Sequence, residues 1–165
     1  MIVISNTTPL NYLVLIGLID VLPALYGEVA IPEAVLGELQ RAKTPQAVKD
    51  WINSQPAWLL VKRVGLADPS LDALHAGERE AIALAKQIAA DALIIDEKSG
   101  RLAAQHLGIR VIGTMRVLAD AEAAGLCVLE DALDRLQQTS FRLSSQLKNS
   151  FLEAYNREQS RSRIE

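Results

Sequence analysis

The fold of this chain is decided by the stretch Ala92-Leu93-Ile94-Ile95-Asp96-Glu97, in which four aliphatic residues run directly into two acids. In the same way Ile2-Val3-Ile4 runs into Ser5, and Val111-Ile112 runs into Gly113-Thr114. Short aliphatic strands that are separated by longer helical patterns are typical of a parallel sheet covered on both faces. We therefore predict a three-layer α/β/α fold with a central parallel sheet of about four to five short strands.

The rest of the chain continues this alternation. Further strands are predicted at Val29–Ile31 and Trp58–Val61, and one helical turn is predicted after Pro69. The predicted helices cover residues 10–19, 19–26, 33–42, 45–54, 78–90, 100–107, 114–124, 129–138 and 143–156. We expect an α/β domain at 1–125 and a helical extension at 126–165 that packs on it, with a polar, poorly ordered tail from residue 156.

The composition excludes several classes of protein. The 165 residues include 17 basic and 20 acidic side chains, which gives a formal charge of −3 and argues against binding nucleic acid by bulk positive charge. One cysteine and two histidines exclude an internal disulfide, cysteine zinc clusters and imidazole-rich metal sites, so a metal would have to be held by oxygen atoms. No signal peptide and no membrane span are recognisable, and we expect a cytoplasmic protein.

Oxygen-bearing side chains gather where the predicted strands end. Asn6 follows the first strand, and Asp96, with Glu97 beside it, follows the strand at 92–95. The carboxyl ends of parallel strands meet at one edge of a sheet, where ligands bind in open α/β folds. We therefore expect these side chains to lie close together.

Two predicted helices add acids on or beside their apolar faces. Glu38 lies beside the apolar stripe of helix 33–42, while Glu78 falls inside the apolar arc of the next long helix and Glu80 falls at its edge. A structural interpretation remains open, because Asp96 can cap a helix and acids stabilise helix N-termini by about 0.3–1 kcal/mol. That interpretation explains the acidity but not the inward direction, since a buried carboxylate needs a partner or a cation. Clustered carboxylates without histidine or cysteine favour Mg²⁺ or Mn²⁺.

Five stretches of the chain occur in the same order in a known family. They are Val3–Leu10, Gly27–Val35, Gly77–Ala85, Leu93–Arg101 and Gly108–Thr114. On these stretches the chain resembles PIN-domain proteins of the DUF3368 type over roughly residues 1–118. The resemblance implies the fold of a metal-dependent ribonuclease, typical of the toxins in VapBC-like type II toxin–antitoxin systems.

The resemblance also implies a set of site residues. The family's acids map onto Glu38, onto Glu78 or Glu80, and onto Asp96. Most members have aspartate at the end of the first strand, whereas this chain has Asn6, whose amide oxygen can ligate a metal with one negative charge fewer. The implied catalyst is an Mg²⁺- or Mn²⁺-dependent endoribonuclease in which the ion is held by those acids and Asn6 orients one ligand.

Five further residues are expected to position the RNA. They are Ser5, Thr7, Lys98, Arg101 and Thr114. The hydroxyls are candidates for hydrogen bonds to the phosphate, and the two cations for contacts with neighbouring phosphates. The structural alternatives are helix caps for the threonines and a solvated helix face for the cations.

The implied partners are an RNA substrate, a small antitoxin and a second copy of the chain in a homodimer. Apolar stripes beyond residue 125 fit either core packing or such an interface. The alternative function is a catalytically weak or inactive PIN-like module that binds an antitoxin or RNA, which Asn6 favours. A receiver-type signalling domain is excluded, because Asn6-Thr7 supplies no acidic pair after the first strand.

Overall fold

The computed structural model describes residues 1–164 and is built around one sheet. Five parallel strands lie in the order β3-β2-β1-β4-β5. Their bounds are β1 Val3–Ser5, β2 Val29–Pro32, β3 Leu59–Lys62, β4 Ala92–Ile94 and β5 Val111–Ile112. The predicted three-layer α/β/α architecture with its short parallel sheet is confirmed.

Successive residues of each strand enter different hydrophobic cores, because side chains of a strand alternate between its two faces. Val3 and Ile94 belong to the larger core, whereas Ile4, Leu93 and Ile95 belong to the smaller one. Both faces of the sheet are therefore buried, which explains why polar and apolar residues do not alternate along its strands.

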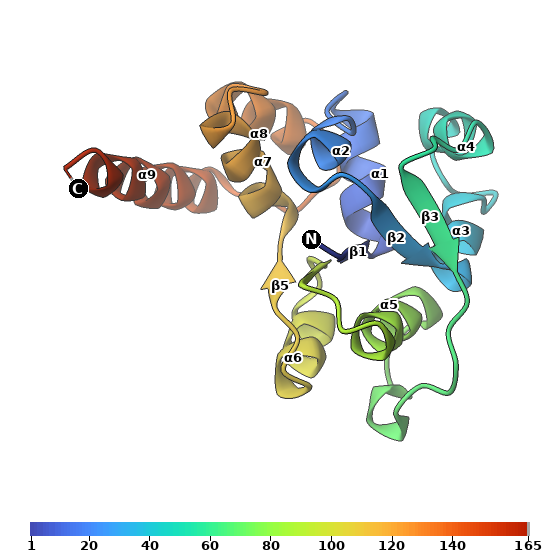
Figure 1. Cartoon of the computed structure of the whole chain (residues 1–165). Coiled ribbons are helices and arrows are strands. Elements are labelled where there is room, and N and C mark those ends of the chain that lie inside the picture. The colour runs from blue at the N-terminus through green and yellow to red at the C-terminus, as the bar shows by residue number, and fades with distance from the viewer. Residues whose placement is uncertain (165) are drawn as a thin grey trace.

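Helices cover the two faces unequally (Figure 1). The smaller core is closed by α5 (Ala76–Gln87) and α6 (Lys98–His106). Helices packed on the larger core are α1 (Thr7–Leu15), α2 (Val21–Tyr26), α3 (Glu33–Leu39), α4 (Gln46–Asn53), α7 (Thr114–Ala123) and α8 (Leu129–Gln137). The single turn predicted after Pro69 is a 3-10 helix, η1 (Pro69–Leu71).

The residues beyond 125 divide between core and surface. Leu129, Leu133 and Leu136 of α8 are buried in the larger core, while Leu126 and Val128 stay 41% and 57% exposed. The last helix, α9 (Ser145–Ser162), projects from the body of the molecule in Figure 1. Residues 1–164 contain no helix that is both long and apolar enough to cross a membrane.

Several predicted helix boundaries differ from the structure, among them those of the helix predicted at 10–19, which spans Thr7–Leu15. The helix predicted at 33–42 ends at Leu39, and the helix predicted from Glu78 begins at Ala76, so that Gly77 lies inside its first turn. The segment from 156, expected to be poorly ordered, is helical as far as Ser162. Ion pairs hold this part of α9, one within the helix between Arg157 and Glu153 and one to α7 between Arg116 and Glu158. Polar residues without apolar periodicity continue a helix when such pairs support it.

Candidate functional site

The first strand and the fourth strand deliver Asn6 and Glu97 to the same edge of the sheet. Asn6 is the N-cap residue of α1 and Glu97 is that of α6, and the Asn6 side chain is 2% exposed. The Asn6 amide Nδ2 donates to Glu97 Oε2 at 3.2 Å, and the Thr8 hydroxyl donates to Glu97 Oε1 at 2.5 Å. Asn6 and Thr8 therefore fix the direction of the Glu97 carboxylate.

Helix α3 contributes Glu38, whose two oxygens are each held by a donor. The Thr7 hydroxyl donates to Oε2, and the Gly77 backbone N–H donates to Oε1 at 3.0 Å. A Cβ atom at Gly77 would lie 2.6 Å from Glu38 Cδ, so only glycine lets α5 approach this carboxylate so closely. The start of α5 is therefore shaped around Glu38.

Helix α5 contributes Glu78, which is only 7% exposed. Burial raises the pKa of Glu78, and the carboxylates of Glu97 and Glu38 raise it further, while His75 lowers it. A Cβ atom at Gly100 would lie 3.1 Å from Glu78 Oε2, so a glycine in α6 leaves room for this oxygen. The Glu78 carboxylate thus lies in low-dielectric surroundings beside two further acids.

Two buried oxygens at this edge have no hydrogen-bond partner. Among residues 1–164 only three buried side-chain nitrogen or oxygen atoms lack a partner, and two of them are Asn6 Oδ1 and Glu78 Oε2. The third is the hydroxyl of Tyr26. Since an unpaired buried acceptor costs about 1–3 kcal/mol, its occurrence at this edge needs an explanation.

We call the cavity that contains these groups the acidic pocket. It has a volume of about 330 Å³ and is lined by Asn6, Thr7, Thr8, Glu38, Arg41, His75, Ala76, Glu78 and Glu97. The nearest ion pair is weak, because the largely exposed Arg41 Nη2 lies 4.0 Å from Glu38 Oε1. Three carboxylates therefore share a pocket with little positive charge.

The residues of the acidic pocket fit a hard divalent cation. Asn6 Oδ1 and Glu78 Oε2 are buried oxygen atoms without a hydrogen-bond donor, so both could contact a cation. Mg²⁺ is commonly held by one or two carboxylates together with several waters. No three Asp, Glu, His or Cys side chains in the described part of the chain are arranged so that they could hold a metal by themselves. Asn6 is outside those four residue types, and Mg²⁺ usually keeps several waters in its coordination shell, so fewer acids than three would suffice.

Asp96 lies in a different environment, which we call the Asp96 corner. Its Oδ1 accepts from the Thr114 N–H at 2.8 Å and its Oδ2 accepts from the Thr114 hydroxyl at 2.6 Å. Burial raises the pKa of Asp96, while the two bonds from Thr114 lower it. Asp96 thus fixes the N-terminus of α7, as the capping interpretation of this residue requires.

The other predicted site residues are held by protein groups. Glu80 points to α3, where its Oε2 accepts from the Ala34 N–H at 2.9 Å, so it is not brought together with Glu38 and Glu78. The buried Ser5 hydroxyl donates to the Asn6 carbonyl at 2.9 Å. Arg101 donates to the Ile95 carbonyl at 3.1 Å, whereas Lys98 is exposed.

Glu97 is the residue whose importance the sequence did not reveal. The strand ends in two consecutive acids, and which of them faces the acidic pocket depends on the turn into α6. Thr8 was treated only as a cap, yet its hydroxyl orients Glu97. The sequence does contain one indication, because two consecutive acids at the end of a strand can have separate roles.

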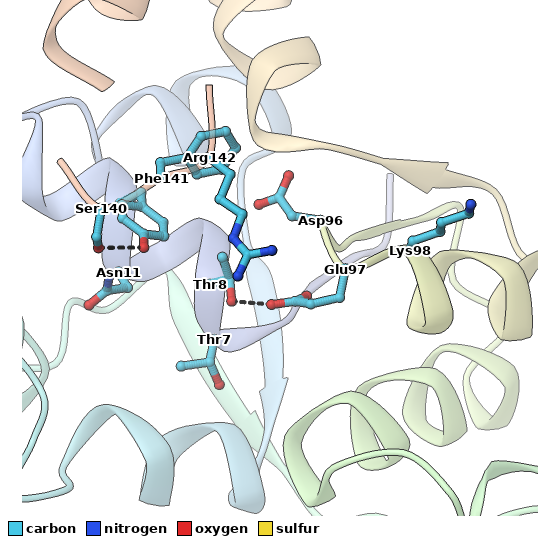
Figure 2. Close-up of a pocket in the computed structure, with 10 residues that line it drawn as sticks. Thr7, Thr8, Asn11, Asp96, Glu97, Lys98, Ser140, Phe141 and Arg142 are labelled. Atoms are coloured by element: carbon cyan, nitrogen blue, oxygen red, sulfur yellow. Dashed lines mark hydrogen bonds between the residues drawn. The ribbon is translucent and has the colours of Figure 1, made fainter. Parts of the chain in front are cut away.

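A second cavity, which we call the neighbouring pocket, adjoins the acidic pocket. It has a volume of about 630 Å³ and is lined by Thr7, Thr8, Asn11, Tyr12, Asp96, Glu97, Lys98, Ser140, Phe141 and Arg142. Thr7, Thr8 and Glu97 line both cavities. Figure 2 shows the Arg142 side chain extending into the neighbouring pocket on the side of Asp96 and Glu97.

Comparisons with known proteins agree with this fold. One solved structure is a PilT N-terminus domain protein, SSO1118, from the hyperthermophilic archaeon Sulfolobus solfataricus P2, with a TM-score of 0.55 and 19% sequence identity. The match covers 73% of this chain and 93% of that chain, and at this identity it shows the fold alone. No curated protein sequence matches the chain.

A family model is more specific. The model of DUF3368, described as a PIN domain, matches residues 2–157 and thus extends through α8 and most of α9. The resemblance found in the five sequence stretches is therefore confirmed. The chain belongs to the DUF3368 family of PIN domains.

Proposed function

We propose that this protein is an Mg²⁺- or Mn²⁺-dependent endoribonuclease and the toxin component of a VapBC-like type II toxin–antitoxin system. The observation that carries the proposal is the pair of buried, unpartnered oxygens, Asn6 Oδ1 and Glu78 Oε2, beside the carboxylates of Glu38 and Glu97. Membership of a PIN family supports nuclease chemistry at this edge of the sheet. The antitoxin partner rests on the family resemblance.

The proposed metal ligands are Asn6 and Glu78 directly, with Glu38 and Glu97 acting directly or through water. A bound divalent ion lowers the pKa of a water molecule and stabilises negative charge on the phosphoryl oxygens. Thr7 and Thr8 keep the carboxylates of Glu38 and Glu97 aimed at the pocket. Such support matters, because loss of an outer-shell partner typically lowers metal affinity or activity by about 10–100-fold.

The buried position of Glu78 links the charge of the acidic pocket to metal binding. Burial and the neighbouring acids raise the pKa of Glu78, and a cation bound beside it would lower that pKa again. The acidic pocket also repels RNA phosphates unless its charge is neutralised. Engagement of the scissile phosphate is therefore coupled to metal binding.

The direct test is cleavage of single-stranded RNA by the purified protein, with Mg²⁺, with Mn²⁺ and with EDTA. We expect cleavage with either ion and none with EDTA. Cleavage that persists in EDTA, or that stays the same in Glu78→Gln, would overturn the proposal. A neighbouring gene for a small DNA-binding protein that binds this chain would support the toxin assignment.

The second candidate is an inactive PIN-like module that binds an antitoxin or RNA. Asn6 favours it, because a neutral amide stands at the end of the first strand and reduces the negative charge of the pocket. Substitution Asn6→Asp separates the two candidates. The enzyme proposal expects the wild type to bind metal and cleave RNA, whereas the module proposal expects metal binding only after the substitution.

The proposed partners have a candidate surface away from the acidic pocket. Leu126, Val128 and Leu147 remain 41%, 57% and 48% exposed. We propose that these exposed apolar residues are available to the antitoxin or to a second copy of the chain. Alanine substitution of Val128 should weaken either association without changing RNA cleavage.

A further inference from the structure

The geometry points to the neighbouring pocket as a subsite for the RNA nucleotide next to the cleaved bond, with Arg142 as its main phosphate contact. This inference rests on the proposed ribonuclease function and adds a second part of the chain to it. The loop between α8 and α9 would thus be part of the RNA-binding site.

The position of the pocket is the first argument. Thr7, Thr8 and Glu97 line it and also line the acidic pocket, so the two cavities adjoin. An RNA strand whose phosphate lies at the acidic pocket can therefore place an adjoining nucleotide in the neighbouring pocket. A volume of about 630 Å³ lies within the range of about 300–1,000 Å³ that is typical of small-molecule sites.

The charge of the pocket is the second argument. Lys98 and Arg142 line it, are exposed and form no ion pair or hydrogen bond with the residues that the structure describes. The acids of the same pocket, Asp96 and Glu97, keep their charge but are held by neutral donors, Thr114 for Asp96 and Asn6 and Thr8 for Glu97, and not by the two cations. Two free cations are thus presented to a phosphate beside the acidic pocket, and an arginine binds phosphate with two parallel hydrogen bonds.

The rigidity of the loop is the third argument. The Tyr12 hydroxyl and the Ser140 hydroxyl are 2.8 Å apart, and the rings of Tyr12 and Phe141 pack edge to face at 5.1 Å. The Phe141 N–H donates to the Thr139 hydroxyl at 3.2 Å. These contacts attach the loop to α1 and fix the backbone just before Arg142 beside the pocket, so its unpartnered side chain needs only to turn towards a phosphate.

The composition of the pocket also fits a nucleotide. Proteins that bind single-stranded RNA combine aromatic side chains with cations that follow the backbone. Here Phe141 is followed directly by Arg142, and the amide of Asn11 offers a donor and an acceptor to the edge of a base. The chain as a whole has a formal charge of −3, and Lys98 and Arg142 are the cations that line this pocket, beside Asp96 and Glu97.

The test measures binding of a fluorescein-labelled single-stranded 2′-O-methyl RNA to the full chain with Mg²⁺ present, so that the charge of the acidic pocket is neutralised. The RNA is checked for integrity after each measurement, so that cleavage does not contribute. We expect Arg142→Ala to weaken binding about tenfold. The slope of log affinity against log salt should fall by about 0.7, the value for one phosphate contact on a single strand. Arg142→Lys should keep that slope and recover part of the affinity, because it keeps the charge but not the paired hydrogen bonds.

Arg161→Ala is the matched control, since it removes one positive charge from the exposed end of α9 and should change neither quantity. Equal affinities of Arg142→Ala and Arg161→Ala, or no RNA binding by the parent protein at low salt, would overturn the subsite. Cleavage kinetics of the otherwise wild-type chain separate this inference from the proposed function. An Arg142→Ala effect on binding without any cleavage by the wild type would contradict the nuclease and leave the subsite standing.

Discussion

The acidic pocket and the Asp96 corner are both built from acids at the carboxyl ends of parallel strands, yet they differ in how their oxygens are satisfied. In the Asp96 corner both carboxylate oxygens accept hydrogen bonds from Thr114. In the acidic pocket Asn6 Oδ1 and Glu78 Oε2 are buried without any donor. Hydrogen bonds hold the carboxylates of Asp96, Glu38 and Glu97 in fixed directions. The difference is that the acidic pocket also contains two buried oxygens without a donor, which are candidates for direct contact with a ligand.

Three carboxylates line the acidic pocket, where burial and the carboxylates of Glu97 and Glu38 raise the pKa of Glu78. Such an arrangement destabilises the free protein at neutral pH and is stabilised by a cation. The comparison therefore predicts that changes in the acidic pocket affect metal binding and cleavage, while changes in the Asp96 corner affect stability.

The largest effect is expected from Glu78→Gln. This substitution keeps the shape of the side chain but removes the charge that a divalent ion needs, so RNA cleavage should fall by at least about 100-fold. Initial rates at saturating Mg²⁺ measure the change. Glu28→Gln, at an exposed glutamate, is the control and should leave the rate unchanged. Equal cleavage rates for the two variants would contradict a special role of the acidic pocket.

The next effect is expected from Gly77→Ala. The added methyl group would lie 2.6 Å from Glu38 Cδ and must displace that carboxylate or the start of α5. We expect cleavage to fall by about 10–100-fold and the free energy of unfolding to fall by about 1–3 kcal/mol.

Gly37→Ala supplies the control for that change. It adds the same methyl group to α3, where nothing lies within 4 Å, and should stabilise the protein by about 0.5–1 kcal/mol. Urea unfolding followed by circular dichroism measures both variants. Unfolding at the same urea concentration for both would contradict the close packing of α5 against Glu38.

Thr114→Val should affect the Asp96 corner without entering the acidic pocket. It removes the hydroxyl that donates to Asp96 Oδ2 while keeping the backbone bond to Oδ1. The free energy of unfolding should fall by about 1–2 kcal/mol, and metal affinity should change less than about threefold. A loss of metal affinity as large as that of Glu78→Gln would show that Asp96 belongs to the metal site after all.

The smallest effect is expected in the pH dependence of stability in EDTA. The folded protein holds a proton on Glu78 more tightly than the unfolded chain does, because its pKa is raised. The contribution of Glu78 to the free energy of unfolding is therefore largest below the ordinary carboxyl pKa. This contribution is lost as the pH rises through the raised pKa of the folded state. Glu78→Gln should gain stability relative to the wild type between pH 4 and pH 7.5, and a difference that does not change with pH would contradict the burial of an unpaired carboxylate.

Much of the fold was predictable, because uninterrupted aliphatic runs such as Leu93-Ile94-Ile95 have few other uses than a buried parallel strand. The inward direction of Glu78 was predictable from helical periodicity. The role of Glu80 was not, because its bond to the Ala34 N–H depends on how α3 meets α5.

The division of labour between neighbouring acids was also beyond the sequence. Asp96 and Glu97 are adjacent, and the turn between β4 and α6 decides that Glu97 is bonded by Asn6 while Asp96 is bonded by Thr114. The position of Arg142 beside this edge depends on how the α8–α9 loop packs on Tyr12. Contacts between residues more than a hundred positions apart leave no local pattern.

Calorimetric titration of Mn²⁺ into the metal-free protein, compared with the same titration of Glu78→Gln, tests the central claim most directly. We predict that the wild type binds the ion through the acidic pocket and that Glu78→Gln loses this binding. Equal binding by both proteins, or no binding by the wild type, would contradict the assignment of Asn6 Oδ1 and Glu78 Oε2 as metal ligands.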